Sequence, residues 1–150
     1  MSSHISHISS LLSFVLSSIL LISCELEVLD NGRMDGNWQL RQIDTLATEG
    51  ICDMTDSLIY WGVQDELLQV RDIDNSNQRI FFRYHLDADS LTIHSPYWAV
   101  TKNELIPVED VETLLPLGIT DTIEKFHINQ LNGGTMILKN KFFRLHFLKY

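Results

Sequence analysis

The amino-acid sequence predicts an all-β fold, an eight-stranded antiparallel up-and-down barrel with one short helix between the fifth and sixth strands. Three observations lead to this fold class. Eight segments alternate apolar and polar residues with the period of a β-strand. Short turn sequences join most of these segments. The chain has no long amphipathic helix pattern to cover an apolar sheet face, so the sheet must close on itself to bury that face.

The N-terminus has the pattern of a targeting signal. Leu11 to Ile22 is a 12-residue apolar run, which is shorter than the about 20 residues of a membrane-spanning helix and fits the core of a signal peptide. The run ends in Leu21-Ile22-Ser23-Cys24, which resembles a bacterial lipobox. That resemblance implies cleavage before Cys24 and lipid attachment to its sulfur. The alternative is an ordinary secretory signal in which this cysteine is incidental.

Domain organisation follows from this N-terminus. We expect a lipoprotein signal peptide over residues 1–23, a lipid-anchored tether over 24–35 and a barrel domain over 36–150. The formal net charge is −9, and the first 23 residues carry no Asp, Glu, Lys or Arg. An acidic chain lacks the clustered Lys and Arg that neutralise phosphates, so no nucleic-acid partner is expected. The contact with the membrane is expected to be the lipid on Cys24.

The strands can be placed in order by their alternation, and the hairpins between them can be checked. A turn at Gln64-Asp65 would pair Trp61 with Leu68. Apolar residues likewise meet across each of the remaining hairpins. The opposite face carries mostly Arg, Lys, His and Thr. The expected strands cover residues 38–46, 57–63, 66–73, 78–86, 90–95, 124–131, 135–139 and 142–149.

The connections differ in length, and this predicts two unlike ends. The long connections, residues 47–56 and 96–122, follow strands one and five and therefore share one end, the mouth. The short hairpins after strands two, four and six share the other end, the floor, with Trp38. Pro107, Pro116 and Gly118 delimit a short helix in the second long connection. Its inward residues are expected to be Val111, Leu114 and Leu115, which would plug or cover the mouth.

The opening Asp35-Gly36-Asn37-Trp38-Gln39-Leu40, together with the meander and the long loop after strand one, resembles the lipocalin or wider calycin architecture. More closely, the chain is similar to small lipocalin-like lipoproteins of Bacteroidota. The resemblance implies an arginine near the end that packs across the tryptophan of the Gly-x-Trp motif. Arg144 is the candidate for Trp38, although alternation puts it on the outer face. Further residues that carry the resemblance are Gly50 to Met54, Leu114 to Ile119 and Phe143 to Phe147.

Chemical sites are not predicted. His85, His94, His127 and His146 fall on the outer face and do not converge, so no metal is expected. Cys52 has no adjacent base in its sequence context, and the chain has no phosphate-binding or nucleophile motif. We therefore expect a protein that is not an enzyme and has no cofactor.

The function predicted from these patterns is binding. A lipid-anchored barrel of the cell envelope, expected on the bacterial outer membrane, would hold a small apolar or glycan-like ligand at its mouth. The sequence leaves open whether it faces the periplasm or the cell surface. The alternative is a structural or interaction lipoprotein with a filled barrel, which engages another envelope protein. The candidate ligand-binding residues are Tyr97, Trp98, Cys52, Trp61 and Tyr84.

Overall fold

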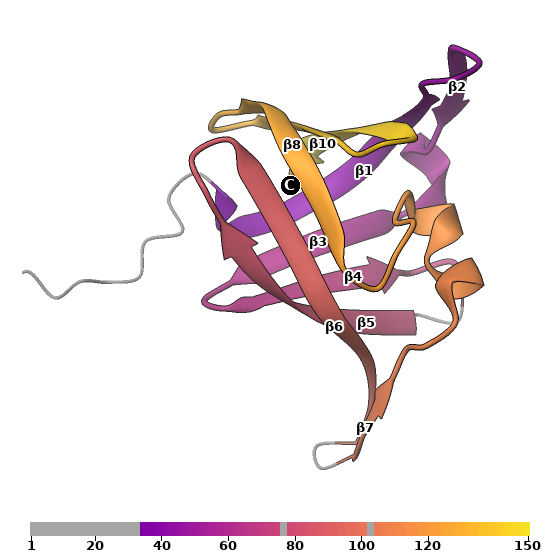
Figure 1. Cartoon of the computed structure of the whole chain (residues 1–150), viewed down its shortest axis with the longest axis vertical. Coiled ribbons are helices and arrows are strands. Elements are labelled where there is room, and N and C mark those ends of the chain that lie inside the picture. The colour runs from indigo at the N-terminus through magenta and orange to yellow at the C-terminus, as the bar shows by residue number, and fades with distance from the viewer. Residues whose placement is uncertain (1–33, 76–77, 102–103) are drawn as a thin grey trace, which may run out of the picture.

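The computed structural model describes residues 34–75, 78–101 and 104–150, which form one closed antiparallel barrel (Figure 1). The sheet has ten strands, of which eight form the wall and β2 and β7 are additions to it. The wall strands are β1 (Gly36–Thr45), β3 (Ile59–Gln64), β4 (Leu67–Asp72), β5 (Gln78–Leu86), β6 (Ser90–Thr101), β8 (Glu124–Leu131), β9 (Thr135–Lys139) and β10 (Phe143–Lys149). The predicted fold class and all eight predicted strands are confirmed.

β1 closes the barrel because it pairs along its length with the last strand. Its partners in β10 run from Lys149, opposite Trp38, to Phe143, opposite Thr45. The first half of β1 also pairs with β3, where Trp38 faces Trp61. The sheet therefore has no free edge in the wall, which satisfies the backbone hydrogen-bonding groups that an open sheet would expose.

The hairpin registers differ from the predicted ones by two residues. Trp61 faces Val70 rather than Leu68, and Leu68 faces Phe82 rather than Tyr84. The first of these turns lies one residue later than expected, and Asp65 adopts a positive φ of 52° there, which Asp tolerates. A slide of two residues leaves every side chain on its own face, because the side-chain period of a strand is also two.

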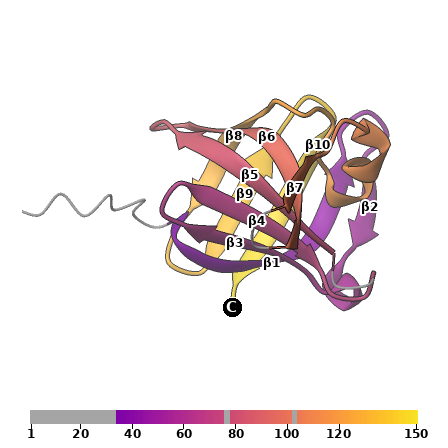
Figure 2. The ribbon, with the colours of Figure 1, turned by 90° about the horizontal axis from the view of Figure 1, so that it is seen from below.

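The structure has two short strands that the sequence did not predict. β2 (Gly50–Asp53) pairs with the second half of β1. β7 (Glu104–Pro107) pairs with β6 and projects with it beyond the wall (Figures 1 and 2). β6 itself runs to Thr101 rather than ending at Ser95. Ser95 bends the strand with a φ of 53°, but the pairing with β5 resumes at Tyr97 and Trp98.

The short helix predicted between the fifth and sixth wall strands is present, but as 3-10 rather than α-helical turns. The two turns are η3 (Val111–Thr113) and η4 (Leu115–Leu117); a third, η2 (Thr55–Ser57), follows β2. Pro116 explains this difference, because it has no N–H to donate and it interrupts an α-helical ladder. Among the residues that the structure describes, no helix is long and apolar enough to cross a membrane.

The 3-10 turns belong to a segment, residues 108–119, that covers the mouth and that we call the lid. Leu114 and Ile119 are fully buried and Leu117 nearly so, whereas Leu115 is exposed, contrary to the prediction. The lid is fixed to the wall at Gly118, whose carbonyl oxygen accepts a hydrogen bond of 3.1 Å from Asn140 Nδ2. The orange turns lie beside β2 at one end of the barrel (Figure 2).

The lumen is filled with side chains. The ring of Trp61 packs against Phe147 with centroids 4.9 Å apart and against Phe126 at 5.9 Å. The exposed fraction is 0% for the following lumen and lid side chains: Trp38, Leu40, Trp61, Leu68, Phe82, Leu91, Ile93, Leu114, Ile119, Phe126, Met136, Leu138 and Leu145. None of them therefore borders a void that a water molecule could enter. Burial of each large apolar side chain stabilises the fold by about 1.5–3 kcal/mol.

Gly118 is a position of the lid that leaves no room for a side chain. Its φ is +77°, and a Cβ at this position would collide with a side-chain methyl of Leu145. We expect Gly118→Ala to lower the free energy of unfolding by about 1–3 kcal/mol, measured by urea denaturation. The control is Gly133→Ala, where a Cβ would meet nothing within 4 Å, and a change within about 0.5 kcal/mol is expected. Equal midpoints for the two variants would contradict the tight lid.

Candidate functional site

The mouth, where the sequence placed the ligand, is closed by the lid. The hollow beneath the lid has a volume of about 50 Å³ and is bordered by Thr113, Pro116 and Leu117 of the lid and by Val70 and Ile80 of the wall. A second hollow, open to solvent and of about 430 Å³, lies next to it on β5 and β6 and is lined by Gln78, Arg79, Trp98, Ala99 and Val100. Ligand pockets measure about 300–1,000 Å³, and one water molecule occupies about 30 Å³. The hollow beneath the lid is therefore too small for an organic ligand, whereas the hollow beside it is an open surface recess.

The five residues proposed as ligand contacts do not come together. Trp61 is fully buried in the lumen, and its indole N–H has no acceptor among the described residues. Tyr84 lies at the floor, where its hydroxyl donates to the Asp65 carbonyl oxygen at 2.6 Å. Cys52 is exposed on β2 at the other end. Tyr97 and Trp98 are neighbours on β6, so their side chains point to opposite faces of the strand.

The residues of the Gly-x-Trp motif have the predicted place but not the predicted partner. Trp38 is fully buried at the floor, and its indole N–H donates to the Met34 carbonyl oxygen at 2.7 Å. The cation over its ring is Lys149, with Nζ 5.1 Å from the ring centroid. The contact between Arg144 and Trp38 that the resemblance implied is not formed. Arg144 faces Asp44 near the other end of β1, and its guanidinium lies 3.8 Å from that carboxylate.

Asp44 is the centre of a small ionic cluster on the outer wall. Its Oδ2 lies 2.7 Å from Nε2 of His146, and its Oδ1 accepts a hydrogen bond of 2.6 Å from Gln42. Burial alone would raise the pKa of Asp44, but the hydrogen bonds from Gln42 and His146 and the charges of His146 and Arg144 lower it below the usual value. Within the described ranges, no three His, Cys, Asp or Glu side chains gather as metal ligands would.

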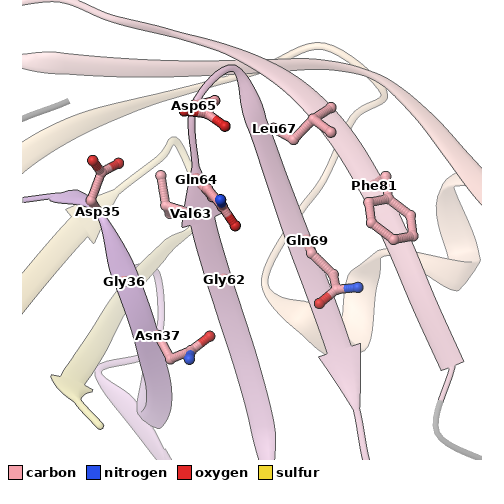
Figure 3. A pocket seen from close by; sticks show the side chains of 10 residues that line it. All are labelled: Asp35, Gly36, Asn37, Gly62, Val63, Gln64, Asp65, Leu67, Gln69 and Phe81. Carbon is pink, nitrogen blue, oxygen red and sulfur yellow. The ribbon is translucent and has the colours of Figure 1, made fainter. Parts of the chain in front are cut away.

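A groove of about 680 Å³ lies on the outside of the wall, over β1, β3, β4 and β5 (Figure 3). We call it the outer groove. The residues that line it are Asp35, Gly36, Asn37, Gly62, Val63, Gln64, Asp65, Leu67, Gln69 and Phe81. It is open to solvent along its length, so it is a surface site rather than an enclosed pocket. Its polar side chains are amides and carboxylates, with one aromatic ring.

The middle of the outer groove is a single row of residues that face each other across neighbouring strands. Asn37 of β1 stands opposite Gly62 of β3, which stands opposite Gln69 of β4. Gln69 in turn faces Phe81 of β5, and Phe81 faces Tyr97 of β6. A Cβ on Gly62 would lie 3.2 Å from Asn37 Oδ1 and 3.9 Å from Gln69 Oε1. The amides of Asn37 and Gln69 therefore flank a stretch of bare backbone at Gly62 (Figure 3).

The floor end of the outer groove is acidic. Asp35 and Asp65 border it, and the hydroxyl of Tyr84 donates to the backbone carbonyl oxygen of Asp65. Burial, and then the charges of Asp35, Asp65 and Glu66, raise the pKa of Tyr84 to about 12. The Oδ1 atom of Asp35 is buried and has no hydrogen-bond partner among the described residues.

The profile of the lipocalin-like domain matches residues 19–150. The chain belongs to this family. A lipocalin-like protein from Bacteroides uniformis ATCC 8492 is similar in structure, with a TM-score of 0.62 and 20% identity over 79% of this chain and 100% of that one. An uncharacterized protein from Bacteroides eggerthii DSM 20697 has a TM-score of 0.57 and 20% identity over 77% of this chain and 98% of that one. No match was found among curated proteins.

Family membership supports a ligand-binding or structural barrel protein, of a fold that generally serves binding rather than catalysis. In this lipocalin-like chain the lumen is filled, and the polar recess lies on the outer wall. The alternation pattern does not predict that recess, because outward polar residues on a strand are usually only solvated. The one available signal was Gly62, since glycine inside a strand often marks a close approach by another group.

Proposed function

We propose that the protein is a lipid-anchored, non-enzymatic binding protein of the bacterial cell envelope that acts through the outside of a filled barrel. The observation that carries this proposal is the lumen, whose side chains have no exposed surface. A ligand inside the barrel would have to displace Trp61, Phe126 or Phe147 from their mutual packing. The filled-barrel alternative is therefore favoured over the ligand at the mouth.

The anchor part of the proposal is supported by the sequence alone. Cys24 lies outside the described residues, and the barrel begins at Gly36. A tether over residues 24–35 reaches at most roughly 40 Å when fully extended. That length would allow the barrel to stand clear of the lipid surface while its outer wall remains accessible.

Removal of the lipid attachment site tests the anchor. We expect Cys24→Ala to move the protein from the membrane pellet to the soluble fraction, because it removes the acylated sulfur. The readout is immunoblotting of fractionated cells. Cys52→Ala is the matched control and should remain in the pellet. If Cys24→Ala sediments with membranes as the natural protein does, the lipid anchor is refuted.

A fluorescent fatty acid tests the filled lumen. We expect cis-parinaric acid at micromolar concentration to give no saturable fluorescence increase, because buried side chains fill the lumen. Leu114→Ala removes a buried side chain of the lid, costs about 2–5 kcal/mol, and serves as the control in which space for the probe has been opened. Saturable binding of one fatty acid per natural protein would overturn the proposed use of the outer surface.

A second candidate function, docking of another envelope protein, is favoured by the β6–β7 hairpin. This hairpin projects from the barrel (Figure 1), and the exposed fractions are 57% for Val100, 57% for Leu105 and 45% for Ile106. Within the described part of the sheet, β7 pairs only with β6. An apolar strand with a free edge is a surface to which another protein can add a strand.

Site-specific photo-crosslinking tests this second candidate. With benzoylphenylalanine at Leu105, we expect one discrete adduct with an envelope protein in intact cells, and we expect Val100→Glu to abolish it by placing a charge in the apolar contact. The control position is Ile51 on β2, which is also exposed. The same adducts from both positions, or none from Leu105, would exclude the hairpin as a docking surface.

A further inference from the structure

We propose that the outer groove binds a neutral glycan chain that lies across β1, β3, β4, β5 and β6. This inference rests on the proposed function and deepens it, because it names the class of ligand that the outer wall would hold. It concerns the row of Asn37, Gly62, Gln69, Phe81 and Tyr97, with the acidic residues at its floor end.

The shape of the row fits an extended chain. Its five residues stand on five adjacent strands, so the row spans roughly 19 Å at the usual spacing between strands. The row runs perpendicular to the strands. Because Gly62 has no side chain, a depression remains in the row between Asn37 and Gln69. A ligand along it would contact several strands at once, as an oligomer of several sugar rings could and a single sugar could not.

The polar groups of the outer groove suit hydroxyls. Each of the side chains of Asn37, Gln64 and Gln69 has a carbonyl acceptor and an NH₂ donor. None of these three amides makes a hydrogen bond to another described side chain or backbone group. A sugar hydroxyl also donates and accepts, so it can pair with either end of an amide. Asp35 lines the acidic end of the outer groove, where a carboxylate accepts hydrogen bonds from hydroxyls, and such charge-assisted bonds are stronger than neutral ones.

The aromatic end of the row suits the apolar faces of sugar rings. Phe81 and Tyr97 are stacked, with ring centroids 5.6 Å apart and an interplanar angle of 16°. Both rings are partly exposed on the outer wall. Nearly parallel rings on adjacent strands form a flat platform, and the C–H face of a pyranose can pack on such a platform while its hydroxyls reach the amides.

The charges select a neutral ligand over an anionic one. Asp35 and Asp65 line the outer groove, and none of the described residues that line it is Lys or Arg. Arg71 and Arg79 face each other two residues along β4 and β5 from Gln69 and Phe81, and Arg71 lies over the ring of Tyr60. Arg83, opposite Leu67 on the same outer face, lies 3.4 Å from the Glu66 carboxylate and is already paired. A uronate, sulfate or phosphate group at the acidic end of the outer groove would therefore meet like charge.

Affinity electrophoresis tests the inference with defined probes. The full-length protein is run in native gels that contain galactomannan, xyloglucan, dextran or laminarin, and in a gel that contains the anionic polymer polygalacturonate. We expect at least one neutral polysaccharide to retard the protein and polygalacturonate not to. Spermidine is added as a competitor, because the acidic end alone could attract a cation; retardation should persist in its presence.

Matched substitutions place the binding on the outer groove. Gly62→Val fills the space between the two amides with a residue that strands favour. Phe81→Ala removes one of the two stacked rings. Each is expected to weaken retardation by about tenfold in apparent affinity. The control is His127→Val, which also puts valine outward on a wall strand. It lies on β8, four strands from β3 in either direction around the barrel. Thermal melts confirm that all three variants are folded.

Three results would overturn the glycan inference: no retardation by any neutral polysaccharide, retardation unchanged in both groove variants, or retardation by polygalacturonate alone. None of these would affect the proposed use of the outer wall, which the fatty-acid experiment tests separately. Saturable fatty-acid binding in the lumen, by contrast, would overturn the proposed function whatever the gels show.

Discussion

The pairing of β1 with β10 is the constraint on which the rest of the structure depends. It closes eight strands into a ring, and a ring of this size has an interior only wide enough for side chains or one small ligand. Trp38 and Trp61 face each other on β1 and β3, and Phe126 and Phe147 enter from β8 and β10. Once these four rings are inside, the interior is full, and the wall outside becomes the surface available for function.

The lid completes this closure at the mouth. Gly118 packs against Leu145, and Asn140 holds the lid by one hydrogen bond while its Oδ1 accepts from the backbone of Phe142 and Phe143. Thr120 then fixes the exit of the lid, because its N–H and its hydroxyl both donate to Glu124 at 2.6 Å. The segment that the sequence predicted to plug or cover the mouth thus contributes Leu114, Leu117 and Ile119 to the core.

The sequence allowed the wall to be predicted but not the outer groove. Alternation shows which residues face inward, and this is why all eight strands and the filled lumen were found. It does not fix register, because a slide of two residues keeps each side chain on its face. With Trp61 opposite Leu68, as predicted, Gly62 would face Leu67; in the structure it faces Gln69. The row exists only in the true register, so no inspection of single strands could have revealed it. β2 and β7 were missed because each has only four residues.

The two glycines that matter most are explained differently, and the difference bears on function. Gly118 is required by its backbone angle and by the contact with Leu145. Gly62 has an ordinary strand conformation, and a Cβ there would meet only the flexible ends of Asn37 and Gln69. Glycine in a strand interior is destabilising by roughly 0.5–1 kcal/mol relative to alanine. The fold gains nothing visible in return for that loss at Gly62. What the glycine does provide is open space between the amides of Asn37 and Gln69, in the same row as the stacked rings of Phe81 and Tyr97. A ligand on the outer wall would use that space.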